Sequence, residues 1–385
     1  MDEDGLRHSR RVVELIKARI EAAGGTISFA DYMNLALYAP GLGYYSAGAA
    51  KFGAAGDFVT APEISALFSQ CLARQCMQVL RALDGGGVLE FGAGTGAMAC
   101  DLLRELEAQQ CLPDYYCIIE LSAELRARQR AQFERRAPHL LGLVTWIDEL
   151  PESGMKGVIL ANEVLDAMAV HRLRWHESGV CEMGVAWRDD CLCWHEMKLE
   201  NPHCIEAVNA LESVLPQRLP NGYETEINLG MIAWLQSVSD VLQEGAALII
   251  DYGFPRQEYY HPQRNDGTLR CHYRHRAHAD PFLYPGLQDI TAHVDMTAVA
   301  EAAHQAGLTV AGYTSQAYFL LANGLMEIAD SIGATATRQQ VDIARQIKTL
   351  TLPGEMGELF KVMALTRGID EPLAGFAMRD ERFRL

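Results

Sequence analysis

Apolar positions along the chain follow two alternating patterns. Short apolar runs, of the length of buried strands, recur between glycine-rich or charged segments. They lie at residues 88–91, 115–120, 143–147, 157–161 and 246–250. Around them, apolar residues have helical spacing at 6–23, 63–83, 97–110, 122–136, after Asn162, at 228–243 and at 296–306. Strands that alternate with helices predict a mainly parallel sheet with helices on its faces.

Two segments depart from this alternation. Residues 171–200 alternate apolar and polar positions, with turns expected at Ser178-Gly179 and Asp189-Asp190, which predicts an antiparallel hairpin or meander inserted in the main domain. Residues 254–294 form a long irregular stretch, and loops of this length are usually lids or binding loops.

Charge excludes some classes of partner. The 385 residues include 33 basic and 50 acidic side chains, for a formal net charge of −17. This balance disfavours nucleic acid, which requires a basic surface, and suits a neutral or basic partner. No apolar run approaches the roughly 20 residues of a membrane-spanning helix. The N-terminal segment lacks a signal-peptide core and carries early acids that disfavour a transit peptide, so we expect a bacterial cytosolic protein.

The glycine-rich segment Glu90-Phe91-Gly92-Ala93-Gly94-Thr95-Gly96 lies between a predicted strand and a predicted helix. Glycines let a ligand approach the backbone, and a helix N-terminus offers free N–H donors. Glu120, at the end of the next strand, can accept hydrogen bonds from the two hydroxyls of a ribose. Both NAD and S-adenosylmethionine contain such a ribose. Because Glu90 would repel a pyrophosphate, the pattern favours S-adenosylmethionine, with an NAD-dependent oxidoreductase or a ligand-free turn as alternatives.

Several longer motifs carry a family resemblance. The chain resembles the MidA family of class I S-adenosylmethionine-dependent methyltransferases over about residues 27–366. The matching segments are Phe29–Met33, Leu35–Tyr45, Gly56–Ser65, Asn162–Ala167, Ile250–Gly253, Gly267–Arg276 and Asp289–Asp295. Departures from the family pattern are Ala54, Ala61 and the segment Asp166-Ala167-Met168-Ala169, which lacks a proline.

The resemblance implies a fold and an activity. The fold would be a mainly parallel sheet with an antiparallel last strand, at about 358–366. Mitochondrial members of the family methylate an arginine of a respiratory complex I subunit during assembly. We therefore expect methyl transfer from S-adenosylmethionine to a guanidino nitrogen of a protein substrate. A small-molecule acceptor and a non-catalytic assembly chaperone that binds S-adenosylmethionine stay open as alternatives.

The expected site lies at the carboxyl ends of the strands, where ligands bind in open α/β sheets. Glu163 is the first candidate for localising the charge of a guanidinium, followed by Asp166 and Asp251; capping and turn roles are the alternatives. The expected cofactor-binding residues are Glu90, Gly92, Gly94, Gly96, Glu120, Leu121, Asp148, Asn162, Thr60 and Glu63. The expected substrate-binding residues are His272, Tyr273, Arg274 and His275.

No metal site is expected. The spacing of His272, His275 and His278 suits neither a strand nor one helix face, and none of the ten cysteines forms a Cys-x-x-Cys pair. The arginines of the 256–278 stretch could bind acidic residues beside a target, or pair with Asp289 and Asp295.

The chain is divided by these features into five predicted units. They are an N-terminal helix and cofactor-covering segment (1–62), the first half of the cofactor-binding core (63–170), a β insertion (171–225), the second half of the core with a substrate loop at 254–294 (226–366), and a C-terminal tail (367–385).

Overall fold

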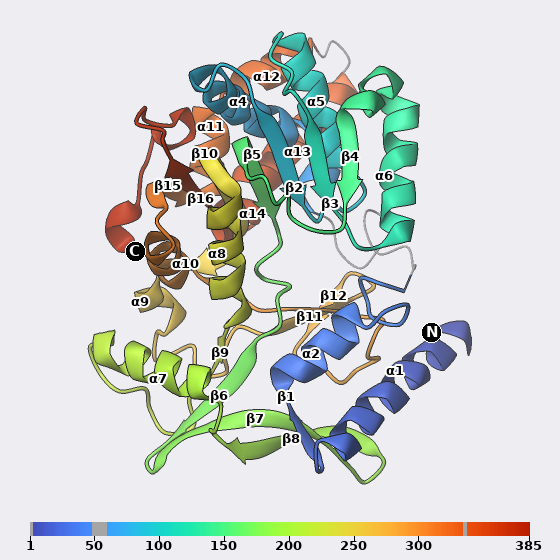
Figure 1. The fold of residues 1–385 in the computed structure, drawn as a ribbon, viewed down its shortest axis with the longest axis vertical. Helices are drawn as coiled ribbons and strands as arrows, with labels where there is room; N and C mark the ends of the chain where they lie inside the picture. The colour runs from blue at the N-terminus through green and yellow to red at the C-terminus, as the bar shows by residue number, and fades with distance from the viewer. Residues whose placement is uncertain (1–2, 48–59, 334–336) are drawn as a thin grey trace.

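The computed structural model describes residues 3–47, 60–333 and 337–385, which form the two lobes stacked in Figure 1. The upper lobe contains an eight-stranded sheet in the order β15-β16-β10-β5-β2-β3-β4, with β14 added to β10. The strands are β2 (Gly87–Phe91), β3 (Tyr116–Ile119), β4 (Val144–Ile147), β5 (Met155–Asn162), β10 (Leu242–Phe254), β14 (Val294–Asp295), β15 (Thr309–Ser315) and β16 (Phe360–Arg367).

The direction of the strands confirms the predicted fold class. Strands β4, β3, β2, β5 and β10 are parallel neighbours, whereas β16 runs antiparallel to both β10 and β15. The parallel strands therefore end at one common edge of the sheet. In Figure 1 this edge faces the lower lobe, into which the chain passes directly after β5.

The sheet is covered on both faces because its strands are apolar at successive positions. Val88 and Val158 point into one core cluster, while Leu89 and Ile159 point into the other, as the two-residue period of a strand requires. Helices of the first cluster are α4 (Ala66–Ala82), α5 (Ala97–Ala108), α6 (Ala123–Arg136), α11 (Gln316–Ala322), α12 (Leu325–Ser331), α13 (Thr337–Thr351) and α14 (Met356–Leu359); those of the second are α8 (Gly230–Val241) and α10 (Met296–Gln305).

The lower lobe combines three parts of the chain. Its larger sheet has the order β1-β7-β6-β9 with β8 also paired to β7, and its smaller sheet has the order β12-β11-β13. One apolar cluster is shared by the N-terminal helices, the insertion and residues 269–292. The elements are α1 (Glu3–Ala22), β1 (Thr26–Ser28), α2 (Phe29–Tyr38), β6 (His171–His176), β7 (Gly179–Arg188), β8 (Cys191–Lys198), α7 (Pro202–Val214), β9 (Glu224–Ile227), α9 (Arg256–Tyr259), β11 (Arg270–Tyr273), β12 (Arg276–His278) and β13 (Asp289–Thr291).

The predicted antiparallel insertion is present as β6, β7 and β8. Its first turn falls at residues 177–178, one position before the expected pair, and its second turn has positive φ at both Asp189 and Asp190. Residues 254–294 are largely irregular, as expected, but they also include α9 and the three-stranded sheet, which the sequence pattern did not predict.

Two helix predictions need correction. The helix expected over 63–83 is divided at Ser65, whose extended backbone separates the short α3 (Ala61–Ile64) from α4. The helix-like segment expected after Asn162 is absent; residues 163–170 form turns that lead into β6. Three short 3-10 helices complete the described ranges: η1 (Pro138–Leu143), η2 (Ala374–Phe376) and η3 (Arg382–Arg384). None of the helices in those ranges is long and apolar enough to cross a membrane.

Candidate active site

The glycine loop between β2 and α5 presents bare backbone to the edge of the sheet. Gly92, Gly94 and Gly96 all have positive φ, which glycine adopts without the strain that a side chain brings. A Cβ atom added at Gly92 or Gly94 would meet no atom within 4 Å. These two positions therefore leave space in which a ligand can lie against the backbone.

Gly96 has a different role, because it faces α6. A Cβ atom there would lie 3.1 Å from the Cα of Gln129.

We expect Gly94→Ala to weaken binding of S-adenosylhomocysteine by roughly 10-fold with a small loss of stability, since left-handed backbone costs a residue other than glycine about 1–2 kcal/mol. Gly96→Ala should lower the melting temperature more, by forcing α5 and α6 apart. Calorimetric titration and thermal denaturation of both variants distinguish these effects; equal stability losses without loss of binding in Gly94→Ala would contradict a ligand-facing Gly94.

Glu90 lies on an inner strand of the sheet, β2, one residue before the strand ends at the glycine loop. Its side chain is buried, and the Tyr116 hydroxyl donates to its Oε2 over 2.7 Å. Its Oε1 is buried without a hydrogen-bond partner among the described residues. Burial, opposed by the Tyr116 hydrogen bond, raises the pKa of Glu90 to about 7. The carboxyl group thus has one acceptor atom available to a donor on a ligand.

Glu120 follows β3 and is held by α6. The Ser122 backbone N–H donates to its Oε1 over 2.9 Å, and Gln129 Nε2 donates to its Oε2 over 3.2 Å and to the Gly94 carbonyl over 3.0 Å. Gln129 is fixed in turn by Trp146, whose Nε1 donates to Gln129 Oε1 over 2.7 Å. Burial raises the pKa of Glu120, against these hydrogen bonds. Gln129 therefore connects the glycine loop, Glu120 and β4, and it was absent from the sequence-based site.

The rim beyond Glu120 is more open. Leu121 is 77% exposed, which is unusual for a large apolar side chain and provides a surface for a flat apolar group. The side chain of Asp148 is 75% exposed and forms an ion pair with Arg126. Arg126 also donates to the carbonyls of Glu120 and Ile147, so it joins the ends of β3 and β4.

The short helix α3 contacts both the glycine loop and Glu163, which follows β5. The Thr95 hydroxyl of the glycine loop donates to Glu63, and the Ala61 backbone forms a hydrogen bond with Glu163. Thr60 precedes α3 as its N-cap residue, although its side chain makes no capping hydrogen bond. The other residues of the predicted cofactor-covering motif, Gly56 to Val59, and the family departure at Ala54 lie outside the described residues.

Three carboxyl groups gather where β5 and β10 end. Asn162 ends β5 and donates to Glu163, which has a positive φ of 54°. Asp251 of β10 is fully buried, and its Oδ2 accepts from the backbone N–H groups of Leu165 and Asp166 over 2.8 and 3.3 Å. Asp251 thereby holds the turn that carries Asp166. The alternative that Asp251 is itself a turn residue is wrong, because it lies within β10.

A fourth acid, Asp289 of β13, joins this group. Asp289 is 2% exposed and accepts a hydrogen bond of 2.8 Å from the Tyr45 hydroxyl. Tyr45 stacks on Tyr38, and the Tyr38 hydroxyl donates to the carbonyl of Ala167 over 2.7 Å. The sequence motifs contained these three residues, but no pattern within the sequence assigned them to the site. We refer to Glu163, Asp166, Asp251 and Asp289 as the acidic cluster.

Three members of the acidic cluster have raised pKa values. Burial, with repulsion from Asp251 and Asp289, raises the pKa of Glu163 to about 8. Burial raises the pKa of Asp251 to about 7, although backbone N–H groups donate to it. Burial and repulsion from Asp251 and Glu163 also raise the pKa of Asp166 well above its usual range.

The expected substrate-binding residues lie on a hairpin of the smaller sheet. His272 and Tyr273 belong to β11, while Arg274 and His275 form its turn, with positive φ and exposed side chains. Arg256 forms ion pairs with Asp295 and Glu301. The pairing of an arginine of the 256–278 stretch with Asp295 was one of the two alternatives expected from the sequence. His272 pairs with Asp289 of the acidic cluster in the register of β11 and β13. The role of the hairpin residues in binding stays a prediction.

Comparison with known families decides between the interpretations of the glycine loop. The sequence model of a family described as "Putative S-adenosyl-L-methionine-dependent methyltransferase" matches residues 71–314. The chain belongs to this family. S-adenosylmethionine is therefore the cofactor of this methyltransferase, and the resemblance to the MidA family is confirmed, in place of the dinucleotide interpretation.

Solved structures and curated relatives agree with this assignment. A crystal structure from Burkholderia thailandensis, bound to S-adenosyl-homocysteine, is 45% identical, with a TM-score of 0.95 over 100% of this chain and 99% of that chain. A mitochondrial protein arginine methyltransferase NDUFAF7 homolog of Drosophila melanogaster is 26% identical over 94% of this chain and 87% of that protein. The mitochondrial protein arginine methyltransferase NDUFAF7 of Danio rerio is 28% identical over 89% and 84%.

Proposed function

We propose that this methyltransferase transfers a methyl group to a guanidino nitrogen of an arginine in a protein substrate. The acidic cluster supports the proposal most directly. Burial and repulsion from Asp251 and Asp289 raise the pKa values of Glu163 and Asp166, and burial raises that of Asp251. Buried carboxylates without a cation are costly, and a guanidinium offers five N–H donors to neutralise them.

Different residues of the acidic cluster would bind the substrate and accept the proton. S-adenosylmethionine supplies an electrophilic methyl group on a sulfonium. Asp166 and Asp289 would hold the guanidinium in place, while ionised Glu163 would accept the proton that the attacking nitrogen releases. One N–C bond then forms, one S–C bond breaks, and the methylated guanidinium keeps its positive charge. Alignment of the two reactants would supply a large part of the rate.

The cofactor-binding part of the proposal rests on the other half of the site. The bare backbone at Gly92 and Gly94 would lie against the cofactor, and Glu120 would accept hydrogen bonds from its ribose hydroxyls. Exposed Leu121 would cover one face of the adenine, with Asp148 at its edge. The proposed cofactor-binding set also includes the Oε1 atom of Glu90, which has no partner among the described residues, and the N-terminus of α5 after Gly96. Its remaining members are Asn162, Thr60 and Glu63.

The names of the relatives add independent support. The two curated relatives described above are protein arginine methyltransferases and are mitochondrial. We further propose that the protein substrate of this chain is a respiratory-complex subunit, and that the reaction takes place in a bacterial cytosol. The first proposal follows the MidA resemblance, and the second is favoured by the 45% identity with the Burkholderia protein.

Catalysis should depend on pH through the cluster. Glu163 and Asp251, with pKa values raised to about 8 and about 7, must be ionised to attract a guanidinium, which stays charged throughout. We therefore expect kcat/KM to rise between about pH 6 and pH 9 and then to level off. A kcat/KM that falls over this range would contradict a cationic acceptor.

The free energy of unfolding should fall as the pH rises, whereas kcat/KM increases. A carboxyl whose pKa is raised from 4.5 to about 8 on folding binds more protons in the folded than in the unfolded chain. Its favourable contribution is complete below about pH 4.5 and is lost as the pH rises through 8. Glu163→Gln should therefore raise the melting temperature at pH 8 more than at pH 5, which thermal denaturation at both pH values can test.

Transfer of label to protein tests the proposal. Radiolabelled S-adenosylmethionine is incubated with the methyltransferase and an extract from cells that lack it, and the labelled product is hydrolysed to amino acids. Label in methylarginine supports the proposal. Label confined to a metabolite would favour a small-molecule acceptor, and absence of label despite cofactor binding would favour an assembly chaperone.

A further inference from the structure

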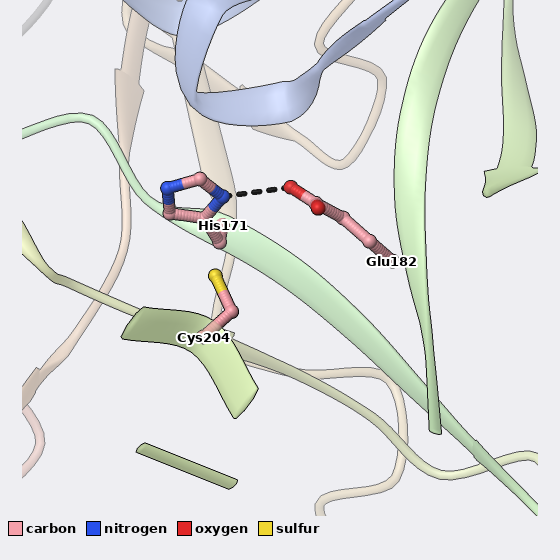
Figure 2. A group of neighbouring side chains, drawn as sticks. All are labelled: His171, Glu182 and Cys204. Atoms are coloured by element: carbon pink, nitrogen blue, oxygen red, sulfur yellow. Dashed lines mark hydrogen bonds and ion pairs between the residues drawn. The ribbon is translucent and has the colours of Figure 1, made fainter. Parts of the chain in front are cut away.

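Three metal-ligand side chains meet inside the lower lobe, away from the acidic cluster. His171 begins β6, Glu182 lies on the neighbouring β7, and Cys204 lies in the first turn of α7. Figure 2 shows the imidazole, the carboxylate and the thiol directed toward one another from these three elements. Their ligand atoms all lie within 4.8 Å of one another, and His171 Nδ1 is 2.7 Å from Glu182 Oε1.

The three side chains are enclosed because they lie on the apolar face of the sheet. Leu173 is two residues after His171 and pairs directly with Glu182, so these side chains share one face. Leu173, Val208 and Leu211 form an apolar cluster that packs this face against α7. Cys204 is fully buried and Glu182 is 3% exposed, whereas the His171 side chain keeps 12% exposure toward solvent. A carboxylate in such surroundings requires a positively charged partner.

The donor set matches zinc. Thiolate, imidazole and carboxylate are the three ligand classes that bind Zn²⁺ in proteins, and three protein ligands leave one tetrahedral position for water. Within the described residues Glu182 forms an ion pair with His171 alone, so no lysine or arginine occupies the position. The second trio of this kind, His176, Cys181 and Glu196, lies on the opposite face of the sheet and is less favourable, because Arg174 already neutralises Glu196.

We propose that His171, Glu182 and Cys204 form a binding site for a zinc ion, in addition to the methyltransferase site. Binding releases the thiol proton of Cys204 and the proton between His171 Nδ1 and Glu182 Oε1, and it replaces the hydrogen bond between these two residues by two bonds to the metal. The ion joins β6, β7 and α7. It also fixes the end of the segment 166–171, whose first residue belongs to the acidic cluster and accepts a backbone hydrogen bond from Ala292.

Metal analysis and cobalt substitution test this site in the full chain. We expect about one zinc ion per chain after dialysis against dilute Zn²⁺, and a thiolate-to-metal charge-transfer absorption when Co²⁺ replaces it. Cys204→Ser should lose the absorption and most of the bound zinc. Cys181→Ser, in the second trio, and Cys191→Ser, an exposed thiol, should keep both.

Two controls keep the outcome decisive. Binding of S-adenosylhomocysteine by Cys204→Ser shows that the variant is folded, and if it is not, His171→Asn provides a second variant with the thiol intact. Zinc should raise the melting temperature of the wild type and not that of Cys204→Ser or His171→Asn. Less than about one tenth of an equivalent of zinc in the wild type, or charge-transfer absorption that survives Cys204→Ser, would overturn the proposal and leave a His171–Glu182 ion pair.

Discussion

Replacement of Glu120 by alanine is expected to weaken the binding of S-adenosylhomocysteine by roughly 100-fold, as measured by calorimetric titration. The carboxylate would accept two hydrogen bonds from ribose hydroxyls, and hydrogen bonds to a charged group contribute about 1.5–3 kcal/mol each. The substitution also removes the acceptor of the Ser122 N–H and one of the two acceptors of Gln129 Nε2. Gln129 would still donate to the Gly94 carbonyl, so the glycine loop should keep its conformation.

The matched control for this change is Glu120→Gln. It keeps the size of the side chain and one acceptor oxygen, so we expect an intermediate loss of affinity and an unchanged fold. Titration with NADH should produce no heat for the wild type or for either variant. Affinity for S-adenosylhomocysteine that is equal in the wild type and Glu120→Ala would show that the cofactor does not bind at the end of β3.

Replacement of Glu163 by glutamine is expected to lower kcat by roughly 100-fold or more, while S-adenosylhomocysteine binds within about 2-fold of the wild type. The amide keeps the shape of the side chain but can neither carry charge nor accept the proton of the guanidino nitrogen. The part of the rise in kcat/KM above about pH 7 should also disappear in this variant, since Asp251 still titrates below it. A single-turnover assay with an arginine substrate measures the chemical step directly.

Exposed and neighbouring acids provide the controls for Glu163. Glu152→Gln alters an exposed carboxyl in the turn before β5 and should leave turnover unchanged. Asp289→Asn removes a charge that raises the pKa of Glu163, so it should lower the pH at which kcat/KM levels off while weakening the binding of the arginine substrate. Full turnover in Glu163→Gln would contradict its role as proton acceptor.

The part of the site that follows directly from local sequence was predictable. Glu90 and Glu120 each lie at the end of an apolar run, and the order of strands in a parallel sheet places both at one edge. Asn162 and Asp251 are next to each other in the sheet for the same reason, since Asn162 pairs with Ile250. These placements need only the register of neighbouring strands.

Contacts between distant segments were not predictable in this way. Asp289 reaches Tyr45 across the lower lobe, over 244 positions of the sequence, and no periodicity encodes such a contact. Gln129 was hidden in a helix whose other residues are mostly charged, and only its burial against Gly94, Glu120 and Trp146 identifies it. The helix expected after Asn162 failed for a related reason, because Asp251, from another strand, binds the N–H groups of Leu165 and Asp166 and holds a turn instead.

The most direct test of the proposed function is quantitative mass spectrometry of arginine methylation in the native cell. Three strains are compared: wild type, a deletion strain, and the deletion strain that expresses Glu163→Gln at the wild-type level. We predict at least one arginine in a cellular protein that is methylated in the wild type and unmethylated in the other two strains. An arginine methylation pattern that is identical in all three strains, with a metabolite that loses its methyl group instead, would contradict methyl transfer to protein arginine.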